Sequence, residues 1–160
     1  AEDRGWREFN PSVSGLGFVN NRDAVEAEEG DLVPRIVDQD PAVVLVTMGL
    51  NDNFSYDRAA DEIHERIDDD LDRLRAGLPD ARIVVVEPFW YTDERPASVD
   101  VIGGWVEEGA AAFVADFIPG ASRWLEGHPE WMAADGLHPN DDGYAEMTRR
   151  MDEELAELGL

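Results

Sequence analysis

The middle of the chain carries apolar residues at helical spacing. Between positions 60 and 78 they step by 3, 4, 4, 3 and 4 residues, which places them on one stripe of an α-helix. Gly77 and Pro79 mark the point where this helix is expected to end. The acidic run Asp68-Asp69-Asp70 is expected on its solvated face. The predicted stripe comprises Ala60, Ile63, Ile67, Leu71, Leu74 and Leu78.

A second amphipathic pattern closes the sequence. Asn140 is a favourable N-cap residue, and Asp141 and Asp142 complement the positive end of a helix dipole. We therefore predict a final helix that begins after Asn140. Its expected buried stripe comprises Tyr144, Met147, Met151, Leu155 and Leu158.

Short apolar runs alternate with these amphipathic segments. Residues 43–48 are uncharged and rich in β-branched side chains, which predicts a strand buried on both faces. Residues 83–86 predict a second such strand and residues 112–117 a third, whereas residues 6–13 are only weakly strand-like. The alternation predicts an α/β fold with a mainly parallel sheet. Because no repeat or linker divides the chain, we expect one domain over residues 1–160.

Composition and charge exclude several classes of protein. The chain has 37 acidic residues against 13 basic ones, all of them arginine, and a formal net charge of −24. Because these arginines do not cluster, binding to nucleic acid is not expected. The absence of cysteine excludes disulfides and thiolate metal sites, and no metal or cofactor is expected. No apolar run predicts a membrane span or a signal peptide, so the cellular location stays unassigned.

A carboxylate and an imidazole lie three residues apart in the segment Asp135-Gly136-Leu137-His138-Pro139. In a turn, Asp135 can accept a hydrogen bond from one ring nitrogen of His138, which leaves the other nitrogen free to act as a base. This is the acid and base half of a Ser-His-Asp system. The same spacing also fits a surface turn that leads into the final helix, so both interpretations stay open.

Two further polar segments have the chemistry of an oxyanion site. Asn51 lies two residues past Gly49, at the end of a predicted strand, where open α/β sheets place their ligands. Its amide and the backbone N–H of Gly15, in a small-residue turn, are suitable oxyanion donors. A helix cap and an ordinary turn are the structural alternatives for these two positions.

Together these segments resemble the SGNH, or GDSL-type, family of serine esterases and lipases. The resemblance implies a flavodoxin-like three-layer α/β/α sandwich. It also implies that Gly15 and Asn51 are oxyanion-hole donors, that His138 is the general base with Asp135 as its orienting acid, and that Asp52 supports the loop. The matching segments are Asn10-Pro11-Ser12-Val13-Ser14-Gly15, Gly49-Leu50-Asn51-Asp52, Glu87-Pro88-Phe89-Trp90 and the segment from Asp135 to Pro139.

One block of the family pattern is absent from this sequence. The family's nucleophile lies in a Gly-Asp-Ser block after the first strand, and this sequence contains no Gly-Asp-Ser. In the family's strand order 2-1-3-4-5, that strand would lie between residues 6–13 and 43–48, and its removal leaves two edges unpaired. We therefore expect that the chain is N-terminally incomplete, or that the strand is supplied in trans. Ser14 lies on the oxyanion side, and no context supports Ser12, Ser55, Ser98 or Ser122 as the nucleophile.

The resemblance implies hydrolysis of a small-molecule ester by a serine nucleophile that lies outside the 160 residues. A non-catalytic module that binds a carbohydrate or acyl ligand is the alternative, and a metal-dependent phosphoesterase needs more ligands than the sequence offers. Phe89 and Trp90 follow a strand end and are candidates for substrate contact, although aromatic residues at such positions also build cores. The absence of an apolar lid-like helix favours small or soluble acyl esters.

Overall fold

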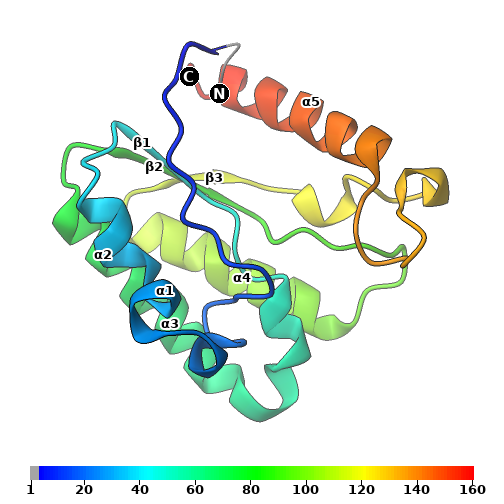
Figure 1. Ribbon diagram of the computed structural model, residues 1–160, viewed down its shortest axis with the longest axis horizontal. Helices are drawn as coiled ribbons and strands as arrows, with labels where there is room; N and C mark the ends of the chain where they lie inside the picture. Colours follow the sequence, from blue (N-terminus) through cyan, green and yellow to red (C-terminus); the bar gives the residue numbers. More distant parts are fainter. Residues whose placement is uncertain (1–3) are drawn as a thin grey trace.

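The computed structural model describes residues 4–160 and contains one parallel sheet of three strands (Figure 1). The strands are β1 (Val43–Val46), β2 (Arg82–Val86) and β3 (Asp116–Ile118), and β2 lies between the other two. Both strong strand predictions are confirmed, with bounds that differ by one or two residues. The carboxyl ends of all three strands therefore lie at one edge of the sheet.

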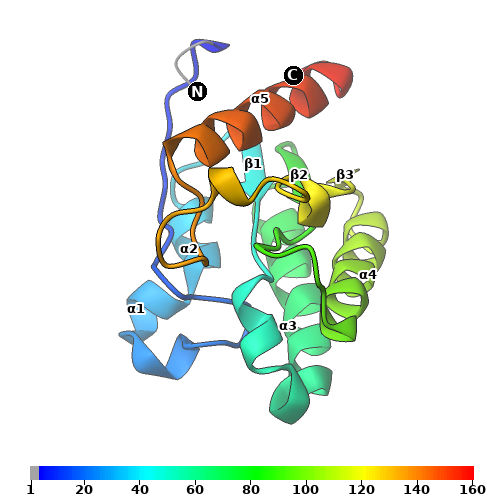
Figure 2. The ribbon, with the colours of Figure 1, turned by 90° about the vertical axis from the view of Figure 1, so that its right-hand side faces the viewer.

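Helices cover both faces of this sheet. Figure 2 shows α5 on one side and α2, α3 and α4 on the other, which confirms the three-layer α/β/α arrangement. The α-helices are α1 (Ala27–Gly30), α2 (Leu32–Val37), α3 (Tyr56–Gly77), α4 (Ala97–Ala112) and α5 (Asp141–Glu157). Short 3-10 turns are η2 (Arg22–Ala24), η3 (Asn51–Phe54), η4 (Ala121–Arg123) and η5 (Pro129–Trp131).

Two apolar clusters hold the layers together. Successive side chains of a strand point to opposite faces, so Ile83 and Val85 pack with α3 and α4 while Val84 and Val86 pack with α5. All four of these side chains are buried. The continuous apolar run of β2 is therefore the sequence signature of a strand covered on both faces.

Helix α3 confirms the predicted stripe, with Ile63, Ile67, Leu71 and Leu74 buried against the sheet. The prediction that the whole acidic run is solvated is wrong at Asp70, which is buried. Its carboxylate pairs with Arg22, which lies in η2, and accepts a hydrogen bond of 3.4 Å from Arg73. Periodicity could not show this because Arg22 comes from a segment distant in the sequence.

Helix α5 begins where the sequence predicts. The Oδ1 atom of Asn140 accepts a hydrogen bond of 3.0 Å from the backbone N–H of Gly143, which is an N-cap. Leu155 is buried as expected, but Tyr144 is exposed, so the expected stripe is wrong at its first position. The first turn of α5 extends past the apolar cluster that covers the rest of the helix.

Two strand predictions need correction. Helix α4 continues to Ala112, and Val114 adopts a left-handed turn with φ of +56°, so β3 begins only at Asp116 and not at position 112. Residues 6–13 form no strand at all. This segment runs past the free edge of β1 in Figures 1 and 2, and no backbone hydrogen bond among the described residues joins the two.

The free edge of β1 is also uncovered on one face. Leu45 pairs with Val84 of β2, yet 40% of Leu45 is exposed while none of Val84 is. The cover that α5 provides over β2 therefore stops before β1. A half-exposed leucine in the middle of a sheet strand, on an unpaired edge, is a surface that other proteins avoid leaving open. Among residues 4–160, no helix is both long and apolar enough to cross a bilayer.

Candidate active site

The segment that carries Asp135 and His138 is a closed loop before α5. Met132 and Pro139 form an isolated antiparallel bridge at its base, and the backbone N–H of Ala133 donates to the carbonyl of His138 at 2.8 Å. Gly136 turns the loop with φ of +65°, a conformation that residues with a Cβ rarely adopt. The loop therefore fixes the backbone on both sides of the histidine.

Asp135 and His138 meet as the spacing predicts. The Nδ1 atom of His138 lies 2.9 Å from Oδ2 of Asp135, and the other oxygen, Oδ1, accepts the backbone N–H groups of His138 and Leu137 at 3.0 and 2.9 Å. Because an ionised carboxylate only accepts, Nδ1 carries the hydrogen of this bond. The bonds from His138 and Leu137 hold the pKa of Asp135 well below its usual range.

The free nitrogen of His138 is therefore available as a base. With Nδ1 protonated, Nε2 has a lone pair in the neutral ring, and the side chain is mostly exposed. The carboxylate keeps its charge at neutral and mildly acidic pH because its pKa is lowered. The carboxylate loses its charge, and with it the charge-assisted hydrogen bond to the imidazole, only when the pH falls through that lowered pKa.

The two predicted oxyanion donors lie on neighbouring segments. Asn51 begins η3, five residues after the end of β1, and one N–H of its side-chain amide donates to the carbonyl of Leu16 at 3.1 Å. An amide group has two N–H donors, so the second stays available. Gly15 has φ of +76°, and its backbone N–H makes no hydrogen bond within residues 4–160. Both positions thus keep one donor for a ligand.

Asp52 ties the glycine turn to η3. Its buried carboxylate accepts the backbone N–H groups of Phe18, Val19 and Asn20 at 2.7, 2.8 and 3.0 Å. Burial raises the pKa of Asp52, while the hydrogen bonds from these backbone N–H groups lower it. The supporting role that the resemblance implies for Asp52 agrees with this geometry. Ser55, which has no sequence context for a nucleophile, is buried and donates its hydroxyl hydrogen to the side chain of Asn20, a contact that the sequence did not reveal.

The position of the Asp52 carboxylate leaves no room for a side chain at Gly17. A Cβ atom there would lie 2.5 Å from the carboxylate carbon and both carboxylate oxygens of Asp52. Hydrogen bonds from three backbone N–H groups hold that carboxylate in place. We expect Gly17→Ala to lower the free energy of unfolding by about 1–3 kcal/mol, as overpacking does. Urea unfolding measures this change in the free energy of unfolding. In Gly104→Ala, the control in α4, the new Cβ meets nothing within 4 Å, so this variant should be as stable as the parent or slightly more so. Equal losses in both variants would contradict the account.

The acid–base pair and the oxyanion donors lie at the same edge of the sheet. Figures 1 and 2 show the loop before α5 and the turn η3 beyond the carboxyl ends of the strands. No hydrogen bond within residues 4–160 joins His138 to Asn51 or Gly15, and none joins it to a serine. Ser55 and Ser122 are buried, and Ser14 is exposed in the glycine turn.

Comparisons with known proteins identify the family of this chain. Residues 2–146 match the model of the GDSL-like lipase/acylhydrolase family. The chain belongs to this family. It is 33% identical, over 118 residues, to a GDSL lipase of Mycobacterium tuberculosis, a match that covers 71% of this chain and 50% of the relative. The chain thus spans about half the length of that relative.

Solved structures show the same fold at lower identity. TesA has a TM-score of 0.70 and 19% identity, covering 92% of this chain and 78% of its own. A carbohydrate esterase family 3 protein from Talaromyces cellulolyticus has a TM-score of 0.65 and 22% identity, covering 91% of this chain and 69% of its own. These likenesses confirm the SGNH hydrolase fold.

The aromatic candidates of this GDSL-like chain differ in accessibility. Trp90 is only 6% exposed, and its indole N–H is shared between the hydroxyl of Thr92 and the carbonyl of Glu94 at 3.0 and 3.1 Å. Phe89 packs against Trp124 in the cluster under α5. Phe54, at the end of η3, is an exposed ring that sequence reasoning did not single out. Contact of Phe89 and Trp90 with a substrate stays a prediction.

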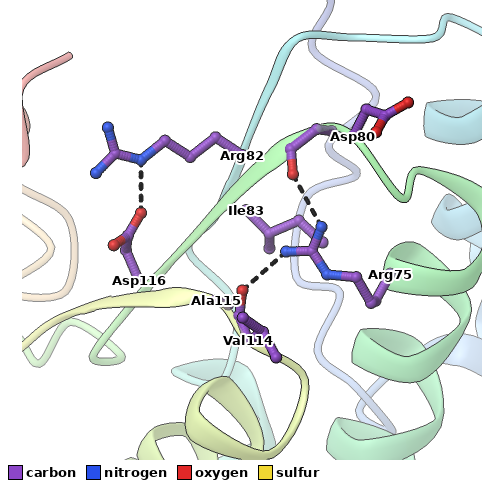
Figure 3. A pocket seen from close by; sticks show the side chains of 8 residues that line it. Arg75, Asp80, Arg82, Ile83, Val114, Ala115 and Asp116 are labelled. Atoms are coloured by element: carbon purple, nitrogen blue, oxygen red, sulfur yellow. Dashed lines mark hydrogen bonds and ion pairs between the residues drawn. The ribbon is translucent and has the colours of Figure 1, made fainter.

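A second polar cluster lies away from His138. Figure 3 shows a hollow at the amino ends of β2 and β3, where Arg82 pairs with Asp116 at 2.7 Å. Arg75 donates there to the backbone carbonyls of Ala81 and Val114, both at 2.9 Å. This hollow lies at the opposite edge from His138. In the described part of the chain, no three His, Asp or Glu side chains gather as a metal site.

Proposed function

We propose that this GDSL-like protein hydrolyses small, soluble acyl esters with a Ser-His-Asp triad whose serine lies outside these 160 residues. The observation that carries the proposal is the hydrogen-bonded pair of Asp135 and His138, with Nε2 free at the carboxyl edge of the sheet. Unlike the exposed pair of His128 and Glu130, this pair has a carboxylate that also accepts the backbone N–H groups of His138 and Leu137, so the group that fixes the tautomer of His138 is itself held in place. A serine hydrolase requires that arrangement.

The reaction follows from the groups that this chain supplies. Nε2 of His138 takes the proton of the serine hydroxyl while the serine oxygen forms a bond to the ester carbonyl carbon. The carbonyl oxygen becomes an oxyanion, and the free N–H of Gly15 and of the Asn51 amide donate to it. Collapse breaks the bond to the alcohol oxygen, which receives the proton from His138. Water then repeats the cycle on the acyl-serine and releases the acid.

A segment that pairs with the free edge of β1 is our proposed source of the serine. A strand that pairs in parallel with this edge ends at the same carboxyl edge as β1, close to the turn that carries Asn51. A helix after it would cover Leu45, the half-exposed leucine of β1. One added strand and helix thus provide both the nucleophile and the missing cover. The segment is either part of the same polypeptide or a partner that binds in trans.

The experiment that tests this proposal is an ester hydrolysis assay on the intact protein as its gene encodes it. We expect hydrolysis of 4-nitrophenyl acetate, and Ser14→Ala is expected to keep the parental rate because Ser14 is not the nucleophile. Loss of activity in Ser14→Ala would place the nucleophile inside the chain and contradict the proposal. Binding of acetate or a saccharide without turnover would favour the non-catalytic module instead.

A further inference from the structure

Two asparagine side chains hold the carbonyl of Gly15. Nδ2 of Asn21 donates to this oxygen at 2.9 Å, and Nδ2 of Asn20 donates to it at 3.3 Å. The backbone N–H of the same glycine is the candidate oxyanion donor, and in the described part of the chain it makes no hydrogen bond of its own. Because glycine has no Cβ, its backbone is freer than that of any other residue. The two bonds to its carbonyl therefore restrict a residue that would otherwise be mobile.

Asn20 is the buried member of this pair, and its contacts lead to the end of η3. A carbonyl only accepts, so the nitrogen of the Asn20 amide faces Gly15 and its oxygen faces Ser55. The Ser55 hydroxyl must then donate to Asn20, and it accepts a hydrogen bond of 2.7 Å from Nη2 of Arg58. Each group has one allowed role. A hydrogen-bonded relay thus runs from Arg58 through Ser55 and Asn20 to the Gly15 carbonyl.

Both ends of η3 are tied to the glycine turn. At its start, Asn51 donates to the carbonyl of Leu16, and just after its end, Ser55 holds the side chain of Asn20. Asn20 and Ser55 are 9% and 1% exposed, so little water competes for the bonds of the relay. The two candidate oxyanion donors lie on these tied segments. The relay therefore fixes the Gly15 N–H relative to the Asn51 amide.

We propose that Asn20 and Asn21 are positioning residues for ester hydrolysis, which hold the Gly15 N–H where it meets the oxyanion together with the Asn51 amide. The inference deepens the proposed function and rests on it for the reaction. Both asparagines act through the Gly15 carbonyl and not on the ester itself. Displacement of a catalytic group by about 1 Å can lower a rate by about a hundredfold, so the bonds behind this donor contribute to kcat.

Asn21→Gly is the variant that tests this role with least disturbance. Asn21 is exposed and has φ of +58°, which glycine adopts without strain, so the variant is expected to fold like the parent. We expect kcat for 4-nitrophenyl acetate to fall at least about threefold, the effect of one lost hydrogen bond. KM is expected to stay within about twofold of the parent, because the oxyanion forms only after the ester has bound.

Asp40→Gly is the matched control. Asp40 is also exposed, has φ of +45° and lies before β1, at the opposite edge of the sheet. It is expected to keep the parental kcat and KM. In the double variant Asn20→Ala/Asn21→Gly, both bonds to the Gly15 carbonyl are lost, and kcat is expected to fall at least about tenfold.

Relaxation measurements by NMR on the intact protein separate this inference from the proposed function. We expect the N–H of Gly15 to have an order parameter S² near about 0.85 in the parent, a lower value in Asn21→Gly and one below about 0.6 in the double variant. If no ester is hydrolysed but the order parameter falls in this way, the proposed function fails and the positioning of Gly15 stands. If Asn21→Gly hydrolyses the ester at the parental kcat, loses no more order at Gly15 than Asp40→Gly, or lowers kcat only as much as Asp40→Gly, the inference is refuted.

Discussion

His138→Ala is expected to lower kcat for ester hydrolysis by about 10²–10⁴, the contribution of a positioned general base. Nε2 of this residue is the proposed proton acceptor, and the alanine variant leaves the serine hydroxyl without a base. The Asp135 carboxylate then keeps its hydrogen bonds from the two backbone N–H groups, so the loop is expected to stay folded. Steady-state kinetics on a soluble acetate ester measure the effect.

The chain offers a matched control for this variant. His128 also has its Nδ1 atom 2.8 Å from a carboxylate, that of Glu130, and it lies on the loop before the one that carries His138. Its ring stacks on Trp131, with centroids 3.7 Å apart, which identifies it as a packing residue. His128→Ala is expected to keep kcat within about twofold of the parent, as a surface substitution does. A parental rate in His138→Ala would remove it from the mechanism.

Asn51→Ala is expected to lower kcat by about 10²–10³ with little change in KM, because an oxyanion donor acts only once the tetrahedral intermediate forms. The second amide N–H of Asn51 is the donor, since the first is held by the Leu16 carbonyl. The measurement is kcat and KM separately, on the same acetate ester.

Asn53→Ala is the control for this second prediction. Asn53 lies in the same turn, and its amide donates only to the backbone carbonyls of Gly49 and Leu50, at 3.3 and 3.1 Å. Its loss loosens η3 without removing a donor from the ligand side. We expect a reduction in kcat much smaller than that of Asn51→Ala. Equal reductions in the two variants would mean that Asn51 acts only by holding the turn.

The parts of the fold that the sequence predicts correctly are those set by local patterns. The uncharged run of β2, the stripe of α3 and the N-cap Asn140 each involve residues close together in the chain. The pair of Asp135 and His138 is local too, since one turn brings residues three apart into contact. These features follow from periodicity and turn geometry.

The parts that sequence reasoning misses depend on contacts between distant segments. Asp70 is buried because Arg22 reaches it from another turn, which no helical pattern can reveal. Residues 6–13 are weakly strand-like in sequence, but no backbone hydrogen bond among the described residues joins them to β1. The ring of Phe54 lies 6.5 Å from that of Trp90, which is 36 positions further along the chain. Burial and pairing across such separations are decided by the assembled fold.

The location of the nucleophile tests the central claim most directly. We would label the intact, active protein with a fluorophosphonate, which reacts with an activated serine, and map the labelled peptide by mass spectrometry. The account predicts one modified serine that lies outside the 160 residues from Ala1 to Leu160, and no labelling in His138→Ala. A label on any serine within these residues, or ester hydrolysis by a protein that takes no label, would contradict it.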